Sequence, residues 1–580
     1  MCEKTEFQNL TVLNYFADMP CAVSGDSTKK IYFCGYLLNR KELQTLLELP
    51  AAADPELMLA MYQRFGADCL KKVKGMFSFV IQDQAKGSLF MARDRVGGKP
   101  LYYALTEGKL VVAPDLKAVL REKPVSCRIN KEALAQYLML SYIPAPLSIL
   151  ENVYKLPAAH SLTVTADGQS RLEEYWDIVY DEKDKIRDYD TCKKELKTRL
   201  FQAVADNLEG ETSAGILLSG GIDSNIITGI TTEVTGGPVD TFSIGYKNVS
   251  KDYDESDRAI LSAKFHKSNH QLFYIEYQNM LDNIEKVIDN IDEPYADSSY
   301  LPTYTISQIA GEHVKTVLTG DAGDELFAGY NKYLIGHYSN SYKKIPGFLR
   351  KGVIEPIVGI LPANKAIVRK MRKVIDNSFL DTYTQRRNVM CLGAHPDMIN
   401  QLLTYDGSGA LDFIAGVYEK YKDTACETDR TLYTDFKVVL EGDMLPKADR
   451  SSTLAGVVSK APILHPDIVE LAAKIPVEYK IQNKNRKIIL KETFIDYVPA
   501  EIVTAKKKGF SIPVANWFQN ELKEDLLATL NPELLKEQGL LNPEYVQKIV
   551  DDHIQNRRNY GGLLWALYVF EKWYQRYFDN

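Results

Sequence analysis

The N-terminal part of the chain contains short apolar runs separated by turn residues. The clearest runs are IYFCGYLL (31–38), GMFSFVIQD (75–83) and SLFMARD (88–94). Runs of this length are typical of strands, and their close succession favours antiparallel sheets over strand–helix–strand units. Helical spacing intervenes at 40–48 and 55–65. The pattern predicts an α+β domain, an antiparallel sandwich, over residues 1–125.

In the C-terminal part, buried apolar runs alternate with helical stretches. The apolar runs lie at 215–218, 238–246 and 314–318, and amphipathic helical spacing fills the intervals. Such alternation predicts a doubly wound α/β domain with parallel strands over residues 189–580. Residues 126–188, which include the proline-restricted YIPAP, are expected to form a linker.

The net charge and the spacing of the cysteines argue against several classes of function. The 580 residues include 70 Lys plus Arg and 77 Asp plus Glu, a net charge of −7, which disfavours a nucleic-acid footprint. Eight cysteines without a CxxC pair suggest neither a zinc ribbon nor a disulfide framework. No apolar leader is visible, so we expect a cytoplasmic protein that does not bind membranes. A local basic cluster over 343–373 is expected to form the solvated face of helices.

The motif SGGIDS (219–224) follows the apolar run 215–218 and opens a helix. Gly220 and Gly221 allow a tight turn whose N–H groups, together with the helix N-terminus, form a cradle for an anion. The motif lacks the lysine of a phosphate-transferring P-loop, so the expected anion is the pyrophosphate of ATP. Asp223 is within reach of Mg²⁺.

A second acidic turn, GDAGDE (320–325), follows the apolar run 314–318. Asp321, Asp324 and Glu325 place three carboxylates within five residues, which repel each other unless a cation neutralises them. Mg²⁺ bound together with ATP phosphates is the cation that we expect here.

These motifs, together with DMLPKADRSS (443–452), resemble the asparagine synthetase family of ATP pyrophosphatases. The resemblance implies ATP and Mg²⁺ as cofactors, with Asp223 and Asp324 as metal ligands. It implies that the nucleotide is bound by Leu217, Ser219, Gly220, Gly221, Ser224, Ile244 and Gly320. It also implies catalytic roles for Asp321, Lys447, Asp449, Arg450 and Lys487.

The N-terminal domain is similar to the glutaminase domain of class II amidotransferases, on the strength of GMFSF, RDRVGGKPLYY and DLKAVL. That family uses an N-terminal cysteine nucleophile on a buried strand. Here Cys2 is followed by Glu3, Lys4 and Thr5. Cys34, Gly35 and Tyr36 replace an Asn-Gly-Glu set, Asn9 replaces an arginine, and Asp54 remains. We therefore expect a degenerate glutaminase site (Cys2, Cys34, Gly35, Asp54) that does not hydrolyse glutamine.

Several identities remain open. In each enzymatic one, Mg-ATP adenylates the carboxylate of a small molecule or peptide, and ammonia or a substrate amine displaces AMP. Three identities compete: an asparagine synthetase using ammonia or glutamine, a relative of β-lactam synthetase or lasso-peptide cyclase, and an inactive scaffold that acts by binding a partner. VVSKAPILH (457–465) departs from the family at Val458, Lys460 and His465. These changes put recognition of free aspartate as the acceptor in doubt. A homodimer, or a partner protein that delivers the substrate, is compatible with all of them.

Overall fold

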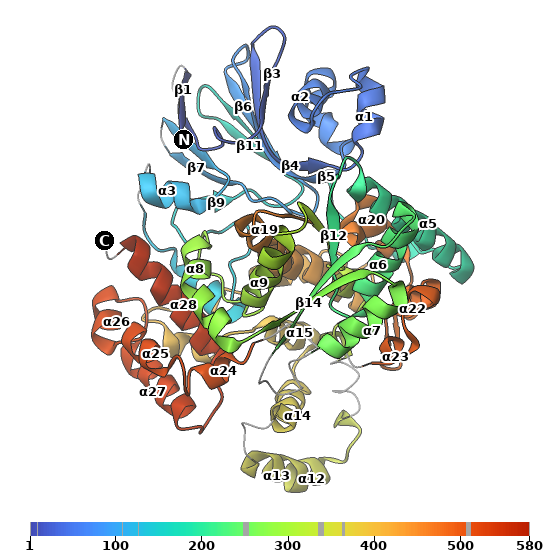
Figure 1. Ribbon diagram of the computed structural model, residues 1–580. Helices are drawn as coiled ribbons and strands as arrows, with labels where there is room; N and C mark the ends of the chain where they lie inside the picture. The colour runs from blue at the N-terminus through green and yellow to red at the C-terminus, as the bar shows by residue number, and fades with distance from the viewer. Residues whose placement is uncertain are drawn as a thin grey trace.

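A computed structural model of the chain describes residues 2–7, 10–106, 108–123, 125, 127–246, 255–334, 342–361, 366–505 and 512–578. It confirms the predicted fold class, because antiparallel sheets in the N-terminal part are followed by a parallel α/β sheet (Figure 1).

Two sheets pack face to face in the N-terminal part. One has the order β1-β2-β8-β7-β9 and the other the order β11-β10-β6-β5-β4-β3. Neighbouring strands are antiparallel except β2 and β8. Apolar side chains of both sheets, such as Val12 and Val80, fill the layer between them, and α1 and α2 cover the outer face of the second sheet. The elements are β1 (Glu3–Phe7), β2 (Leu10–Asn14), β3 (Cys21–Val23), β4 (Lys29–Leu37), α1 (Arg40–Leu47), α2 (Asp54–Phe65), β5 (Gly75–Asp83), β6 (Ser88–Arg93), β7 (Tyr102–Thr106), β8 (Lys109–Ala113) and α3 (Leu116–Glu122).

Residues 126–188, predicted to be a linker, also contribute strands to the two N-terminal sheets. They contain α4 (Lys131–Leu140) and three strands, β9 (Tyr154–Lys155), β10 (His160–Thr165) and β11 (Ser170–Glu174). β9 pairs with β7, and β10 pairs with β6, so these strands complete the two N-terminal sheets.

The second half is built on a five-stranded parallel sheet of order β14-β13-β12-β15-β16. Apolar residues of α5, α6 and α20 form a core on one face, and those of α8 and α9 form a core on the other, which makes the sheet doubly wound. The elements are α5 (Tyr189–Leu208), β12 (Ala214–Leu217), α6 (Ile222–Thr235), β13 (Asp240–Tyr246), α7 (Ser256–His266), β14 (Asn269–Ile275), α8 (Tyr277–Asn290), α9 (Tyr300–Gly311), β15 (Thr316–Leu318), α10 (Gly323–Leu326), β16 (Val458–Lys460) and α20 (Pro466–Lys474).

Helices from the C-terminal region wrap this sheet and bind the linker region. α28 (Gly561–Phe578) packs on α4, where Tyr137 donates a hydrogen bond of 2.8 Å to the carbonyl of Ala566. A long π-helix, η6 (Asp435–Met444), runs directly into α19 (Leu445–Leu454). The remaining elements include α15 (Thr382–Met390), α16 (Ile399–Leu402), α17 (Phe413–Glu419), α18 (Glu427–Thr434), α21 (Val477–Lys480), α22 (Ile488–Thr493), α23 (Ala500–Val503), α24 (Val514–Trp517), α25 (Lys523–Thr529), α26 (Pro532–Gln538) and α27 (Pro543–Ile554).

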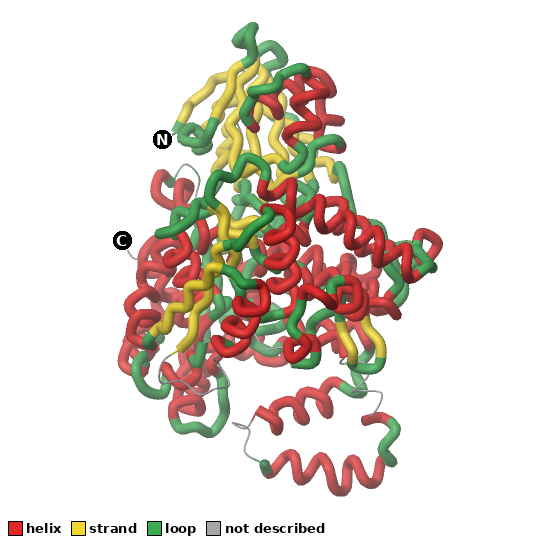
Figure 2. The backbone as a smooth tube through the Cα atoms, turned by 45° about the vertical axis from the view of Figure 1, so that its right-hand side comes forward, coloured by secondary structure: helices red, strands yellow, loops and turns green. Residues whose placement is uncertain are grey.

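A helical hairpin stands out from the body of the molecule. Its first arm is the continuous run α12 (Gly347–Leu349), η4 (Arg350–Ile354) and α13 (Glu355–Ile360), and its second arm is α14 (Ala366–Asn377). Figure 2 shows both arms projecting away from the rest of the chain. Among the described residues, no helix has the length and apolar character needed to cross a bilayer.

Candidate active site

The SGGIDS motif forms the predicted turn between β12 and α6. Gly220 has φ +71°, and a Cβ there would lie 2.7 Å from the carbonyl carbon of Arg258, so only glycine fits. Gly221 caps α6, whose first-turn N–H groups therefore face the turn. The Ser219 and Ser224 hydroxyls lie 3.2 Å apart across it. The turn thus has the shape of an anion cradle.

The GDAGDE turn packs directly against this cradle. A Cβ on Gly320 would lie 2.7 Å from the Cβ of Asp223, and one on Gly323 would lie 2.4 Å from its Oδ1. These approaches require glycine, and they bring Asp324 of α10 next to Asp223 of α6. Two turns that lie about a hundred residues apart in sequence are therefore one structural unit.

Lys487 completes this unit from a third segment. Its Nζ lies 2.5 Å from Oδ2 of Asp223 and 2.7 Å from Oδ1 of Asp324. Burial alone would lower the pKa of Lys487, but the two carboxylates outweigh burial and raise the pKa above its usual value. The ammonium therefore stays charged, and it joins the two acids that were predicted to hold a cation.

A cavity of about 1030 Å³ opens over these residues, which is large enough for a nucleotide and a second substrate. It lies at the carboxyl ends of β12, β13 and β15, where doubly wound sheets place their sites. The predicted residues that line it are Leu217, Ser219, Gly220, Gly221, Asp223, Ser224, Ile244, Gly320, Asp321, Asp324, Lys447 and Lys487.

Lys447 and Asp321 occupy other parts of the cavity wall. The Nζ of Lys447 lies 3.1 Å from Asp297 and 3.0 Å from the Ser299 hydroxyl. Burial would lower the pKa of Lys447, yet the nearby Asp297 carboxylate and other acids raise it above its ordinary value. Asp321 accepts a hydrogen bond of 2.8 Å from Thr319. The cavity therefore has a charged cation and a carboxylate besides those at Lys487.

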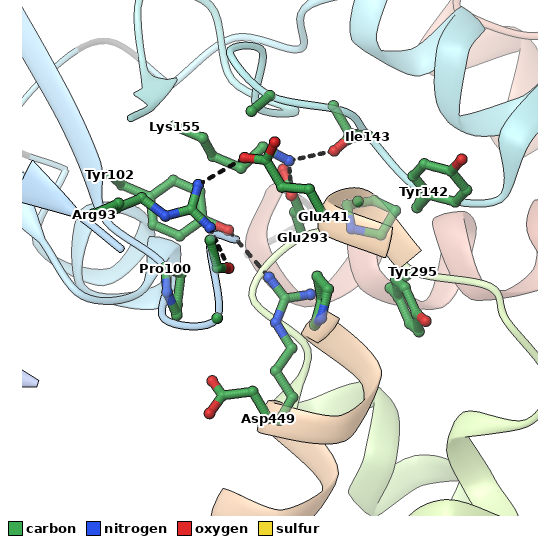
Figure 3. Close-up of a pocket in the computed structure, with 17 residues that line it drawn as sticks. Arg93, Pro100, Tyr102, Tyr142, Ile143, Lys155, Glu293, Tyr295, Glu441 and Asp449 are labelled. Atoms are coloured by element: carbon green, nitrogen blue, oxygen red, sulfur yellow. Dashed lines mark hydrogen bonds and ion pairs between the residues drawn. The ribbon is translucent and has the colours of Figure 1, made fainter. Parts of the chain in front are cut away.

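Asp449 and Arg450 do not line this cavity, contrary to the prediction. Both lie beside a second, smaller cavity of about 40 Å³ at the contact between the two halves of the chain (Figure 3). The periodicity of α19 explains the difference: Lys447 and its neighbour Ala448 face one side of the helix, whereas positions 449 and 450 fall on the opposite side. Asp449 pairs with Lys99, and Arg450 lies 3.1 Å from Asp292.

Further ion pairs cross the same contact. Arg93 lies 3.1 Å from Glu441, with both side chains buried, and Lys155 lies 2.5 Å from Glu293 and 2.5 Å from the carbonyl of Ile143. Figure 3 shows these groups pointing toward one another around the small cavity. Residues of the N-terminal half thus neutralise acids on η6, α19 and the segment that leads to Asp297.

The residues of the expected degenerate glutaminase site lie before β1, on β4 and at the start of α2. Cys2 is exposed and precedes the edge strand β1. On β4, burial raises the pKa of the Cys34 thiol to about 11. Gly35 has φ +118°, and a Cβ there would lie 2.0 Å from the carbonyl oxygen of Met76. Asp54 receives two hydrogen bonds from Arg40, at 2.8 and 3.0 Å, and one from the N–H of Leu37.

Val458, Lys460 and His465 do not line the large cavity, although Ser459 between the first two does. Lys460 lies 2.7 Å from Glu211, His465 lies 3.2 Å from Asp206, and Val458 is exposed on β16. Of the three, none lines the cavity, so the prediction that they bear on the acceptor is not supported by their position. Asn9 lies outside the described residues.

Sequence reasoning missed four cations of the cavity wall, of which Lys484 is one. Arg486 and Lys491 flank Lys487, and Arg258 lies 3.0 Å from Glu255. Burial, followed by the charges of Arg486 and Lys487, lowers the pKa of Lys491. The spacing of Lys487 and Lys491, one helical turn apart in RKIILKE, was the signal that could have found one of them.

Comparison with known proteins gives matches over both halves. A family model described as asparagine synthase matches residues 195–575, and one described as a glutamine amidotransferase domain matches residues 12–176. The chain is 26% identical to asparagine synthetase (glutamine-hydrolyzing) 1 of Bacillus subtilis, over 95% of this chain and 86% of that protein. It is 35% identical to putative asparagine synthetase (glutamine-hydrolyzing) 2 of Methanocaldococcus jannaschii, over 55% of this chain and 62% of that protein. It is 22% identical to amidase chyE of Penicillium rubens, over 88% and 80%.

Proposed function

Because the chain belongs to the asparagine synthase family, we propose that it activates a substrate carboxylate with ATP and transfers the acyl group to an amine. ATP-dependent formation of a C–N bond follows from the family match. In the proposed sequence, a carboxylate oxygen attacks the α-phosphorus of ATP, which forms an acyl-adenylate and releases pyrophosphate. The amine nitrogen then attacks the acyl carbon, and AMP leaves with the electron pair of the broken C–O bond.

The convergence of Lys487, Asp223 and Asp324 in the large cavity is the observation that carries this proposal. Three segments, separated in sequence by more than a hundred residues each, meet there with N–O distances of 2.5 and 2.7 Å. Burying a cation and two acids costs desolvation free energy, so such a cluster contributes little to stability by itself. Its position beside an anion cradle supports a role in handling phosphate charge.

The donor set fits Mg²⁺. Both acids offer carboxylate oxygens, which Mg²⁺ prefers, and Mg²⁺ sites commonly combine one or two carboxylates with substrate phosphates. Asp223 and Asp324 would hold the ion, which would neutralise phosphate charge as pyrophosphate leaves. The Lys487 ammonium already lies between the same two acids, so it is positioned to turn toward phosphate oxygens once another cation balances them.

The remaining cavity residues divide into nucleotide and substrate groups. The N–H groups of the SGGIDS turn, with the Ser219 and Ser224 hydroxyls, would hold pyrophosphate. Leu217 and Ile244 offer apolar surface for adenosine. Asp321 is placed to accept a proton from the attacking amine, and the charged Lys447 is placed to attract a carboxylate.

The geometry of the N-terminal half supports a nitrogen source other than glutamine. The Asp54 carboxylate, expected to bind the amine of glutamine, is held by Arg40 and by a backbone N–H. Cys34 would not serve as a nucleophile, because a thiol with a pKa of about 11 is protonated at neutral pH. We propose that free ammonia or an amine carried by a substrate attacks the acyl-adenylate.

One observation favours a second candidate, a glutamine-dependent asparagine synthetase. The glutamine amidotransferase model matches residues 12–176, and the two synthetase relatives described above are named as glutamine-hydrolyzing. In this alternative Cys2 supplies the nucleophile. The two candidates share the ATP chemistry and differ only in the release of glutamate.

Exchange of labelled pyrophosphate into ATP tests the ATP chemistry, with a panel of carboxylates that begins with aspartate. Asp324→Asn and Lys487→Met should each lower exchange by about 100-fold or more, because each removes charge that stabilises the departing pyrophosphate. Asp397→Asn and Lys71→Met are matched controls with side chains 89% and 66% exposed. They should exchange at the wild-type rate.

The assignment fails if the cavity variants fold and exchange as the wild type does. The assignment also fails if the wild type exchanges pyrophosphate with no carboxylate in the panel and instead cleaves ATP to ADP and phosphate.

A further inference from the structure

The projecting hairpin carries apolar side chains that the fold leaves exposed. Ten of the 23 exposed large hydrophobic residues of the described chain lie between 348 and 380. Phe348 is 74% exposed, Ile357 is 54% exposed and Ile360 is 86% exposed. Exposed apolar residues that are concentrated in this way mark an interaction surface, whereas scattered ones do not.

The exposed residues form stripes along both arms. On the first arm, Leu349, Val353 and Ile357 follow one another at intervals of four residues, which places them on one helix face. On the second arm, Ile367 and Met371 have the same interval. Arg372 joins the arms, because its guanidinium donates to the carbonyls of Val358, Gly359 and Leu361. The hairpin is therefore an amphipathic unit with two apolar stripes.

The same segment is strongly basic. Residues 342–380 contain nine Lys or Arg and two acids, a charge of +7, in a chain whose net charge is −7. The rest of the chain thus carries −14. Lys343, Lys344 and Lys351 are exposed beside the apolar stripes. The prediction of a solvated basic face accounts for these lysines but not for the apolar residues between them.

We propose that this hairpin docks on an anionic lipid surface, lying in the interface without crossing it. Helices with an apolar stripe flanked by Lys and Arg insert that stripe at the boundary between headgroups and acyl chains, and their cations are attracted to anionic lipids. This proposal replaces the expectation that the protein does not bind membranes.

Shape and charge favour lipid over a protein partner. The hairpin projects from the body of the molecule (Figures 1 and 2), and its residues line none of the three cavities described in the chain. Protein partners anchor side chains in concave pockets, which a bilayer does not require. A second copy docked hairpin to hairpin would bring together two segments whose sequences each carry a charge of +7.

The test is co-sedimentation of the full-length protein with two kinds of vesicle, phosphatidylcholine alone and phosphatidylcholine mixed with phosphatidylglycerol. The wild type should sediment with the anionic vesicles and not with the neutral ones, and high salt should release it. Ile357→Ser combined with Ile360→Ser should abolish binding. Removing the charges of Lys343, Lys344 and Lys351 with glutamine should weaken it on the order of 100-fold, or about 5-fold per cation.

Val179→Ser is the matched control, since Val179 is 54% exposed, like Ile357, and lies outside the hairpin. It should bind as the wild type does, and all variants should keep wild-type pyrophosphate exchange because they lie outside the active site. Wild-type protein that binds neither kind of vesicle, or binds both equally, overturns the proposal. The proposal is also overturned if the wild type self-associates in the absence of lipid and the combined Ile357→Ser and Ile360→Ser variant does not. The apolar surface would then bind a second copy of the chain.

Discussion

For Lys487, the sequence predicts a role in the site, whereas only the structure reveals its contacts. The resemblance to a family predicted a catalytic role for this lysine. The contact with both Asp223 and Asp324 could not be predicted, because it depends on three segments meeting in space. The same limit applies to Asp449 and Arg450, since the resemblance assigned both to the site but could not show which face of α19 meets which cavity.

Lys480 is a second lysine with an unusual environment, far from any predicted role. Its side chain is fully buried, and among the described residues its Nζ has no hydrogen-bond partner. Asp429 is already paired with the buried Lys185 at 2.6 Å. Burial therefore lowers the pKa of Lys480 to about 7, and the attraction of Asp429 only partly compensates.

This environment predicts a pH-dependent gain in stability for Lys480→Met. Between pH 7 and about 10.5, the unfolded state binds a proton at Lys480 that the folded state lacks, so this lysine makes the wild type more stable as pH rises. At pH 7 its deprotonation costs on the order of 4 kcal/mol. Lys480→Met should therefore unfold at higher urea concentration than the wild type at pH 7, and the difference should shrink toward pH 10.

Lys183→Met, at an exposed lysine, is the control and should change stability little at any pH. An unchanged or lower urea midpoint for Lys480→Met at pH 7 would show that Lys480 is stabilised by its surroundings.

At the scale of elements, the two glycine-containing turns and α22 act as one unit because their backbones approach closely. Gly329 lies at this junction, where a Cβ would fall 1.8 Å from Oδ1 of Asp324 and 2.1 Å from Cε of Lys487. No rearrangement of one side chain relieves both overlaps.

Gly329→Ala should therefore displace Asp324 and Lys487 together. We expect pyrophosphate exchange to fall by about 100-fold and the free energy of unfolding to fall by about 1–3 kcal/mol. Gly416→Ala in α17 is the control, since a Cβ there meets nothing within 4 Å. Wild-type exchange by Gly329→Ala would show that the tight junction is not needed for the chemistry.

The periodic elements were the most predictable. β5, α6 and β13 lie where the patterns placed them, within a few residues. The strands β9, β10 and β11 were not predicted: β11 is largely exposed, so its residues lack an apolar pattern. The pairing of β10 with β6 supports a domain boundary between β11 and α5, which we propose in place of a linker over 126–188.

At the scale of the whole molecule, the contact between the two halves explains why an N-terminal domain without glutaminase activity would be retained. Arg93, Lys99 and Lys155 neutralise Glu441, Asp449 and Glu293 across that contact. Loss of such cations would leave buried acids unpaired next to the segments that carry Lys447 and Asp297. The N-terminal half therefore supports the synthetase site through charge and packing.

We propose that this chain joins an amine to an ATP-activated carboxylate without drawing nitrogen from glutamine. The most direct test of this proposal is to measure AMP and glutamate in one reaction of the full-length protein with Mg-ATP, the carboxylate panel, and either glutamine or an ammonium salt as nitrogen donor. A substrate that carries its own amine belongs in the panel. AMP should form with ammonium or the substrate amine, and no glutamate should form from glutamine with either the wild type or Cys2→Ala. Glutamate released by the wild type in step with AMP, but not by Cys2→Ala, would contradict the account.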